Sequence, residues 1–193
     1  ELKKGLAHGP QIAGANVGKL LKCLRATGAV PSSVKDPVWK YKWVQAHEPE
    51  NFLRADKWLD VKDYLLLRCT GRAVMTEDSA YAALLYDTRK GAWSDELCRI
   101  FGVDMAHLPP IIQASSQVGG RTGQAAAELG LTPGTPVFGG GGDASLIGVG
   151  AGATAVGSTH IYCGTSGWVS TVTDRQRVDV SAMIAAIVGA QRG

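Results

Sequence analysis

Two glycine-rich turns in the last third of the chain carry the residues best suited to chemistry. Residues 139–142 are all glycine and precede Asp143, and residues 164–167 contain Thr165 and Ser166 between two glycines. Glycines let a backbone approach a ligand closely, and an aspartate held at such a turn can accept a proton. Backbone N–H groups and hydroxyls of a turn can hold a phosphate. The two turns together indicate phosphoryl transfer.

The elements around the first turn place Asp143 at the beginning of a helix. Val137 and Phe138 form a short strand, and Ala144 begins a helix that continues to Val149. The free N–H groups and the positive end of the helix dipole favour an ionised carboxylate at Asp143, which suits a general base. Aspartate is also a common helix cap, so base and cap are equally supported, and one residue can do both.

The second turn follows a strand that runs from Thr159 to Cys163, and Trp168 begins another. We therefore expect residues 164–167 to form the tip of a β-hairpin. Most glycine-rich hairpin tips are simply turns. This tip follows the first turn after a linker of small residues, 148–157, and that position favours a phosphate contact.

A dinucleotide site and a P-loop are the two alternatives to a kinase site. Residues 139–144 satisfy the relaxed dinucleotide pattern G-x-G-x-x-A after a strand. However, Asp143 would repel the pyrophosphate, and the next strand ends in Tyr162-Cys163-Gly164, without the acid that holds a ribose. The dinucleotide interpretation therefore ranks below the kinase interpretation. No G-x-x-x-x-G-K-[ST] loop occurs in the sequence.

The remaining sequence predicts helices that alternate with short strands, which indicates an α/β architecture. Asn16 and Gly28 bracket the first helix, and Asp36-Pro37 starts a second that carries Trp39 and Trp43, both expected in the core. The further expected helices are 61–69, 79–86, 94–101 and 122–129, and the further expected strands are 57–60 and 118–121.

Composition limits the classes of function. The 193 residues are 45% hydrophobic, which suits one globular domain, and a net charge of +3 argues for neither a nucleic acid nor a membrane partner. The start shows no secretory signal, and no apolar run is long enough to span a bilayer. Cys23, Cys69, Cys98 and Cys163 lack metal-ligand spacing and are expected to be reduced, buried thiols of a cytoplasmic protein.

The chain resembles the FGGY carbohydrate kinases of the actin-like ATPase superfamily, and within them the xylulokinase-like branch. The segment 140–143 resembles the catalytic-base motif of this family, and 161–167 resembles its second phosphate loop. The resemblance extends to P-x-x-K at 37–40, K-D-Y at 62–64 with T-G at 70–71, and W-S-D-E-L at 93–97. Together these motifs cover almost the whole chain in the order that the family has.

The resemblance implies the first domain of an actin-like, ribonuclease H-like fold, with a mixed sheet flanked by helices. It implies that Asp143 deprotonates a sugar hydroxyl, most simply of a pentulose such as xylulose, with Ala144 beside the substrate. Gly142 would line the junction of sugar and phosphate, and Gly164, Thr165 and Ser166 would contact ATP. Many relatives have Gln or Asn where Ala144 stands, so one sugar contact is missing or supplied elsewhere.

The family also implies ATP and Mg²⁺ as cofactors, a D-x-G-T loop that organises the metal, and a second domain that binds adenine. The sequence has no D-x-G-T loop and supplies no metal ligands of its own. We therefore expect residues 1–175 to be a partial first domain and 176–193 the beginning of the second. Val178, Val180 and Met183, with the tail 185–188, would form its first strand. On this expectation the chain is an internal fragment that has little activity alone. The full-length protein could form a homodimer. A non-catalytic sugar-binding remnant is the main alternative, ahead of a dinucleotide-binding domain.

Overall fold

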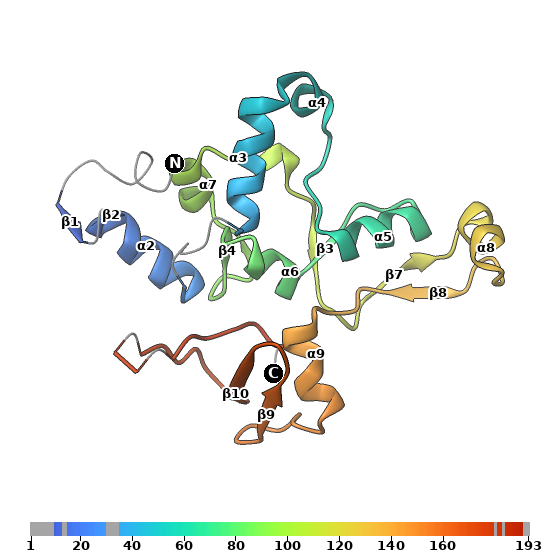
Figure 1. Ribbon diagram of the computed structural model, residues 1–193. Helices are drawn as coiled ribbons and strands as arrows, with labels where there is room; N and C mark the ends of the chain where they lie inside the picture. Colours follow the sequence, from blue (N-terminus) through green and yellow to red (C-terminus); the bar gives the residue numbers. More distant parts are fainter. Residues whose placement is uncertain (1–9, 13–14, 30–34, 180, 183, 191–193) are drawn as a thin grey trace.

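The chain forms short helices and strands in alternation, as the α/β expectation requires. The computed structural model describes residues 10–12, 15–29, 35–179, 181–182 and 184–190 (Figure 1). The helices are α2 (Val17–Thr27), α3 (Pro37–His47), α4 (Pro49–Arg54), α5 (Val61–Thr70), α6 (Glu77–Ala82), α7 (Asp95–Phe101), the 3-10 helix η1 (Met105–His107), α8 (Gly123–Leu129) and α9 (Asp143–Gly150).

The strands are short and pair two by two. They are β1 (Gln11–Ile12), β2 (Ala15–Asn16), β3 (Met75–Thr76), β4 (Tyr86–Asp87), β5 (Ala92–Trp93), β6 (Ile111–Ile112), β7 (Gln117–Gly120), β8 (Pro136–Phe138), β9 (Thr159–Cys163) and β10 (Gly167–Thr171). Within the described ranges these strands make two-stranded sheets, of which β3 with β6 is parallel and the others are antiparallel.

Helix ends follow the capping residues that the sequence provides. Asn16 accepts a hydrogen bond from the Lys19 N–H at 3.0 Å, and Gly28 closes α2 with φ of 74°. The Thr122 hydroxyl caps α8 by accepting from the Ala125 N–H at 3.2 Å. A side-chain acceptor satisfies backbone N–H groups that the first turn of a helix leaves unpaired, which is why these boundaries were predictable.

The largest apolar cluster lies where α2, α3 and α7 meet. Its buried members are Cys23, Ala26, Val38, Tyr41, Leu85, Leu97, Cys98, Phe101, Val103 and Leu108. Trp39 packs against this cluster with its ring centroid 5.6 Å from that of Phe101. Trp43, by contrast, is 53% exposed and stacks on His47, so the expectation of a buried Trp43 was wrong.

Two predicted elements differ from the structure. Residues 57–60 are not a strand, because the Trp58 N–H donates to the carbonyl of His107 at 2.7 Å instead of entering a ladder. The helix expected over 79–86 ends at Ala82, and Leu84 adopts a left-handed φ of 61° that redirects the chain into β4.

The four cysteines differ in how deeply they are buried. Cys23 and Cys98 are buried as expected, and desolvation raises the pKa of each to about 11. Cys69 is half-buried, whereas Cys163 is exposed at the end of β9, so the expectation of a buried thiol was wrong there. All four are free.

Residues 186 and 188 contact α6 and the strands β3 and β4. The Tyr81 hydroxyl donates to the carbonyl of Ala186, and Val188 packs against the cluster of Met75, Ala80 and Tyr86. Residues 185–188 are therefore not the strand that was expected. Val180 and Met183 lie outside the described residues.

Two parts of the ribbon extend away from the main cluster in Figure 1. One consists of β7, β8 and α8, and the other of α9 with the β9–β10 hairpin. The four-glycine turn joins β8 to α9, so it lies between these two parts.

Candidate active site

Backbone hydrogen bonds fix the glycine turn, and there is no space for a side chain at Gly139. The Gly139 N–H donates to the Ser116 carbonyl at 3.0 Å, and the Gly140 N–H donates to that of Ala114 at 2.9 Å. A Cβ atom at Gly139 would lie 2.8 Å from Cγ2 of Thr76, and Gly140 has a left-handed φ of 64°. Sterics and conformation therefore both require glycine here.

Asp143 is the first residue of α9, as the sequence predicted, and its side chain is exposed. Its Oδ1 atom accepts the N–H of Ala144 at 2.8 Å. Within the described part of the chain, Oδ2 makes no hydrogen bond. One oxygen is thus held by the helix, while the other is available to a substrate. The N-cap of α9 is Gly142, so the expectation that Asp143 caps the helix was wrong, while the general base at Asp143 stays a prediction.

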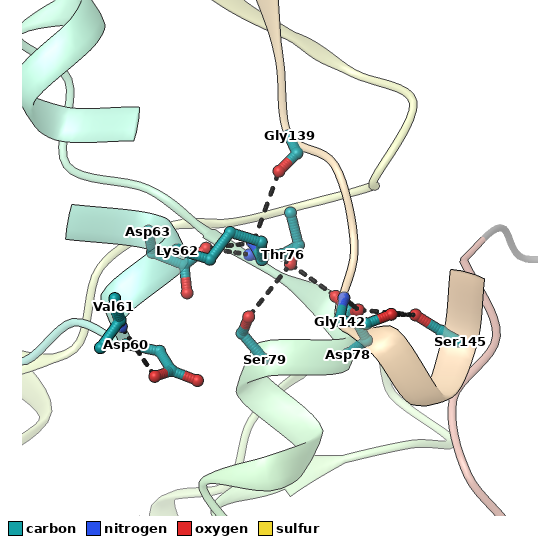
Figure 2. A network of polar contacts seen from close by, with 10 residues as sticks. All are labelled: Asp60, Val61, Lys62, Asp63, Thr76, Asp78, Ser79, Gly139, Gly142 and Ser145. Carbon is teal, nitrogen blue, oxygen red and sulfur yellow. Dashed lines mark hydrogen bonds and ion pairs between the residues drawn. The ribbon is translucent and has the colours of Figure 1, made fainter. Parts of the chain in front are cut away.

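A polar network lies beneath the turn and is contributed by three separate segments (Figure 2). The Asp78 carboxylate, at the start of α6, accepts from the Gly142 N–H and from the Ser145 hydroxyl, the latter at 2.8 Å. The Thr76 hydroxyl donates to the other oxygen of Asp78. Lys62, on α5, donates to Thr76 Oγ1 at 2.8 Å and to the Gly139 carbonyl at 3.4 Å. The network therefore joins α5, α6 and the turn.

The two carboxylates of this network have opposite pKa shifts. Desolvation is the largest influence on Asp78 and raises its pKa, but hydrogen bonds from Thr76, Gly142 and Ser145 outweigh it, so the pKa is lower than usual. Asp63 is fully buried, and desolvation raises its pKa in spite of the hydrogen bond from Lys62. Asp78 is therefore held ionised, whereas Asp63 depends on Lys62 to carry a charge.

The second turn is the tip of the hairpin formed by β9 and β10, as expected. The Gly164 N–H donates to the Ser166 carbonyl at 2.9 Å, and the side chains of Thr165 and Ser166 are exposed. Tyr162 stacks on Trp168 with centroids 4.1 Å apart, and a Cβ atom at Gly164 would lie 2.5 Å from the Tyr162 hydroxyl. A side chain at this position would therefore have to displace the Tyr162 ring.

Helix α9 and strand β9 pack against each other, which connects the two turns. Gly148 lies against the His160 ring, where an added Cβ atom would be 3.0 Å from Cε1. Both ring nitrogens of His160 are buried and have no hydrogen-bond partner among the described residues. Gly142, Asp143 and Ala144 thus share one end of α9, and Gly164, Thr165 and Ser166 share the tip of the adjoining hairpin.

Neither Asp78 nor Ser145 was singled out from the sequence. Asp78 follows Glu77 in the first turn of a short helix, a pattern common at solvated helix starts. Its contacts lie 64 and 67 residues away along the chain, and no local pattern encodes pairs at that distance. Lys62 and Asp63 were noted only as part of a family motif.

The sequence is similar to a known protein family over most of its length. The family model described as "FGGY family of carbohydrate kinases, N-terminal domain" matches residues 19–150. The chain belongs to the FGGY family of carbohydrate kinases. This membership confirms the resemblance expected from the sequence.

Individual FGGY relatives agree with this assignment. The xylulose kinase of Bacillus subtilis (strain 168) is 35% identical over 147 residues, which are 75% of this chain and 29% of that protein. The structure of a gluconate kinase from Lactobacillus acidophilus superposes with a TM-score of 0.80 at 26% identity, covering 92% of this chain and 36% of the other. A ligand-bound xylulose kinase from the same organism gives a TM-score of 0.76 at 28% identity, covering 86% and 34%.

These superpositions confirm the α/β, actin-like ATPase fold that was expected. The chain spans about a third or less of the length of these FGGY relatives. No helix in the described residues is both long and apolar enough to span a membrane.

Proposed function

We propose that this chain supplies the catalytic base and one phosphate-binding turn for ATP-dependent phosphorylation of a sugar hydroxyl, most simply that of a pentulose such as xylulose. The observation that carries the proposal is the exposed Asp143 carboxylate at the start of α9, directly after a turn of four glycines. Relatives named xylulose kinase, including that of Bacillus subtilis, support the choice of sugar.

In this proposal Asp143 accepts the proton of the attacking hydroxyl on Oδ2. The N–H of Ala144 donates to Oδ1, which limits rotation of the carboxylate and leaves Oδ2 to accept the proton. General-base catalysis of this kind accelerates a reaction by about 10² to 10⁴. Gly142 and Ala144 add almost no bulk beside Asp143, so a sugar can approach the helix start.

The hairpin tip fits contacts to an ATP phosphate. Gly164 leaves room for the stacked Tyr162 ring, and the Thr165 and Ser166 hydroxyls are exposed at the tip and can donate to anionic oxygens. When bound, ATP supplies the phosphoryl group that the sugar hydroxyl receives. The chain's own contribution is to hold the phosphate in position.

The described residues contain no cluster of metal-ligating side chains. No group of three or more His, Cys, Asp or Glu side chains converges in the described part of the chain. We therefore assign none of them to the metal that ATP chemistry uses, and we propose that the 193-residue chain alone has little activity. The division into a partial first domain, 1–175, and the beginning of a second, 176–193, belongs to the same proposal, as does a cytoplasmic location.

Titration of the isotope-labelled chain by NMR tests the site directly. We expect xylulose to shift the amide resonances of residues 142–145, and ATP to shift those of 164–166. Sugar-induced shifts without any ATP-induced shift would instead indicate a sugar-binding remnant. Shifts of 140–144 with NAD, and none with sugar or ATP, would replace the proposal with a dinucleotide site.

A further inference from the structure

Asp78 makes the hydrogen bonds that the glycine turn cannot make for itself. Gly142 is the N-cap of α9, and it has no side chain to cap the helix. The Asp78 carboxylate reaches in from α6 and accepts from the Gly142 N–H and from the hydroxyl of Ser145 (Figure 2). The carboxylate therefore acts as an external cap, and its negative charge lies at the positive end of the helix.

The two residues that Asp78 contacts lie on either side of Asp143 in the sequence. Gly142 is the residue before it, and Ser145 is the third residue of the helix. The Ser145 hydroxyl has one proton, and the ionised Asp78 at 2.8 Å is a better acceptor than the Gly142 carbonyl at 3.0 Å. One carboxylate oxygen thus fixes the helix start on both sides of the proposed base.

Asp78 is itself held in place by a second layer. Its other oxygen accepts from the Thr76 hydroxyl, and Thr76 accepts from Lys62. Lys62 also donates to the Gly139 carbonyl, so the same chain of contacts reaches the first residue of the turn. Both ends of the turn are therefore tied to one network, which leaves the turn little freedom to change conformation.

We propose that Asp78 is the positioning residue of this site and sets the direction in which the Asp143 carboxylate leaves the helix. The inference rests on the proposed function, because it assigns Asp78 to the base used there. Asp78 acts through Gly142 and Ser145 and touches no substrate. A residue that only stabilised the fold would not change the environment of Asp143 in protein that remains folded. The proposed positioning role predicts such a change when Asp78 is replaced.

The test is NMR of the labelled 193-residue chain and its variants. In the unchanged chain, we expect the Gly142 amide proton to follow the ionisation of Asp78, with a midpoint below 3.8. Asp78→Ala should move that proton upfield and shift the amide of Ala144, which reports on Asp143 through its hydrogen bond. Asp78→Asn, which keeps one carbonyl acceptor, should restore part of both shifts.

Two further variants keep the test decisive. Ser145→Ala removes only one of the contacts, and it should also shift the Ala144 amide, so it tests the inference if Asp78→Ala does not fold. Asp95→Asn is the matched control, because Asp95 is an exposed acid in the first turn of α7. An Ala144 amide that stays in place in folded Asp78→Ala or in Ser145→Ala overturns the inference. Absence of sugar binding by the unchanged chain would count against the proposed function alone.

Discussion

The ammonium group of Lys62 donates a hydrogen bond to the carbonyl oxygen of Gly139, 77 residues further along the chain, at 3.4 Å. The same ammonium lies 2.5 Å from Oδ1 of Asp63, a side chain with no exposed surface. Lys62 therefore has two tasks, since it neutralises a buried carboxylate and ties the glycine turn to α5. Its replacement should affect stability and site geometry together.

We expect Lys62→Met to lower the free energy of unfolding by about 3 kcal/mol, because it leaves the Asp63 carboxylate buried without its partner. Urea titration measures the loss. Lys22→Met is the control, since the Lys22–Glu96 pair is half exposed on both sides and should contribute far less to stability. Adding Asp63→Asn to Lys62→Met should recover part of the loss. A double variant less stable than Lys62→Met would contradict this explanation.

The opposite pKa shifts of Asp78 and Asp63 predict opposite effects of pH. Because the folded pKa of Asp78 lies below 3.8, its ionised form stabilises the fold above that value, and this contribution disappears as pH falls through the lowered pKa. The advantage of the unchanged chain over Asp78→Asn in unfolding free energy should shrink in the same range. If the unchanged chain remains more stable than Asp78→Asn at the lowest pH, the charge of Asp78 is not the source of the difference in stability.

For Asp63 the sign is reversed. Its folded pKa lies above 3.8, so the folded state binds more protons than the unfolded state between 3.8 and the raised value. Stability should fall as pH rises through this window, and Asp63→Asn should remove that part of the dependence. Denaturant titrations at a series of pH values measure both effects. If Asp63→Asn leaves the pH profile unchanged, Asp63 does not titrate in this range.

Asp143→Asn tests the proposed base. In a complete reading frame that contains this chain, we expect sugar-dependent ADP formation to fall by about 10² to 10⁴, because the amide cannot accept the proton. The melting temperature should stay close to that of the unchanged protein, since the side chain is exposed. Asp95→Asn should leave both quantities unchanged. Full activity in Asp143→Asn would contradict the assignment of Asp143 as the base.

Gly164→Ala should disturb the hairpin tip. The new methyl group would lie 2.5 Å from the Tyr162 hydroxyl, and the stacking of Tyr162 on Trp168 restrains the ring from moving away. We expect ATP affinity to fall by roughly tenfold, equivalent to about 1.4 kcal/mol. Gly123→Ala, whose methyl group would meet nothing within 4 Å, should leave ATP affinity unchanged. Equal ATP affinity in Gly164→Ala and the unchanged protein, measured calorimetrically, would contradict a phosphate contact here.

Thiol reactivity should separate the cysteines. Cys163 is exposed, whereas burial raises the pKa of Cys23 and Cys98 from 9.0 to about 11. At a pH below both values, the buried thiols have about 100-fold less thiolate than an ordinary cysteine, before their lack of access is counted. Alkylation followed by mass spectrometry should therefore label Cys163 first. Early labelling of Cys23 would contradict the packing of α2.

Local rules predicted the parts of the fold in which one residue controls one boundary. The caps Asn16 and Thr122 and the turn at Gly28 were predictable because their partners lie within a few residues. The parallel pairing of β3 with β6 was missed because Met75 and Ile111 meet only through the tertiary fold. The same distinction applies to the site. Asp143 and the hairpin tip could be located from their glycines, whereas Asp78 could not, since its partners are distant in sequence.

The long span of the Asp78–Gly142 contact also determines when the site can assemble. The bond closes a loop of 64 residues, and the cost in chain entropy must be met before the contact contributes any stability. Because folding slows as contacts become less local, we expect α5 and α6 to form before the glycine turn joins them. During synthesis, Asp78 leaves the ribosome well before its partner is made. We therefore expect the geometry around Asp143 to be completed late in folding.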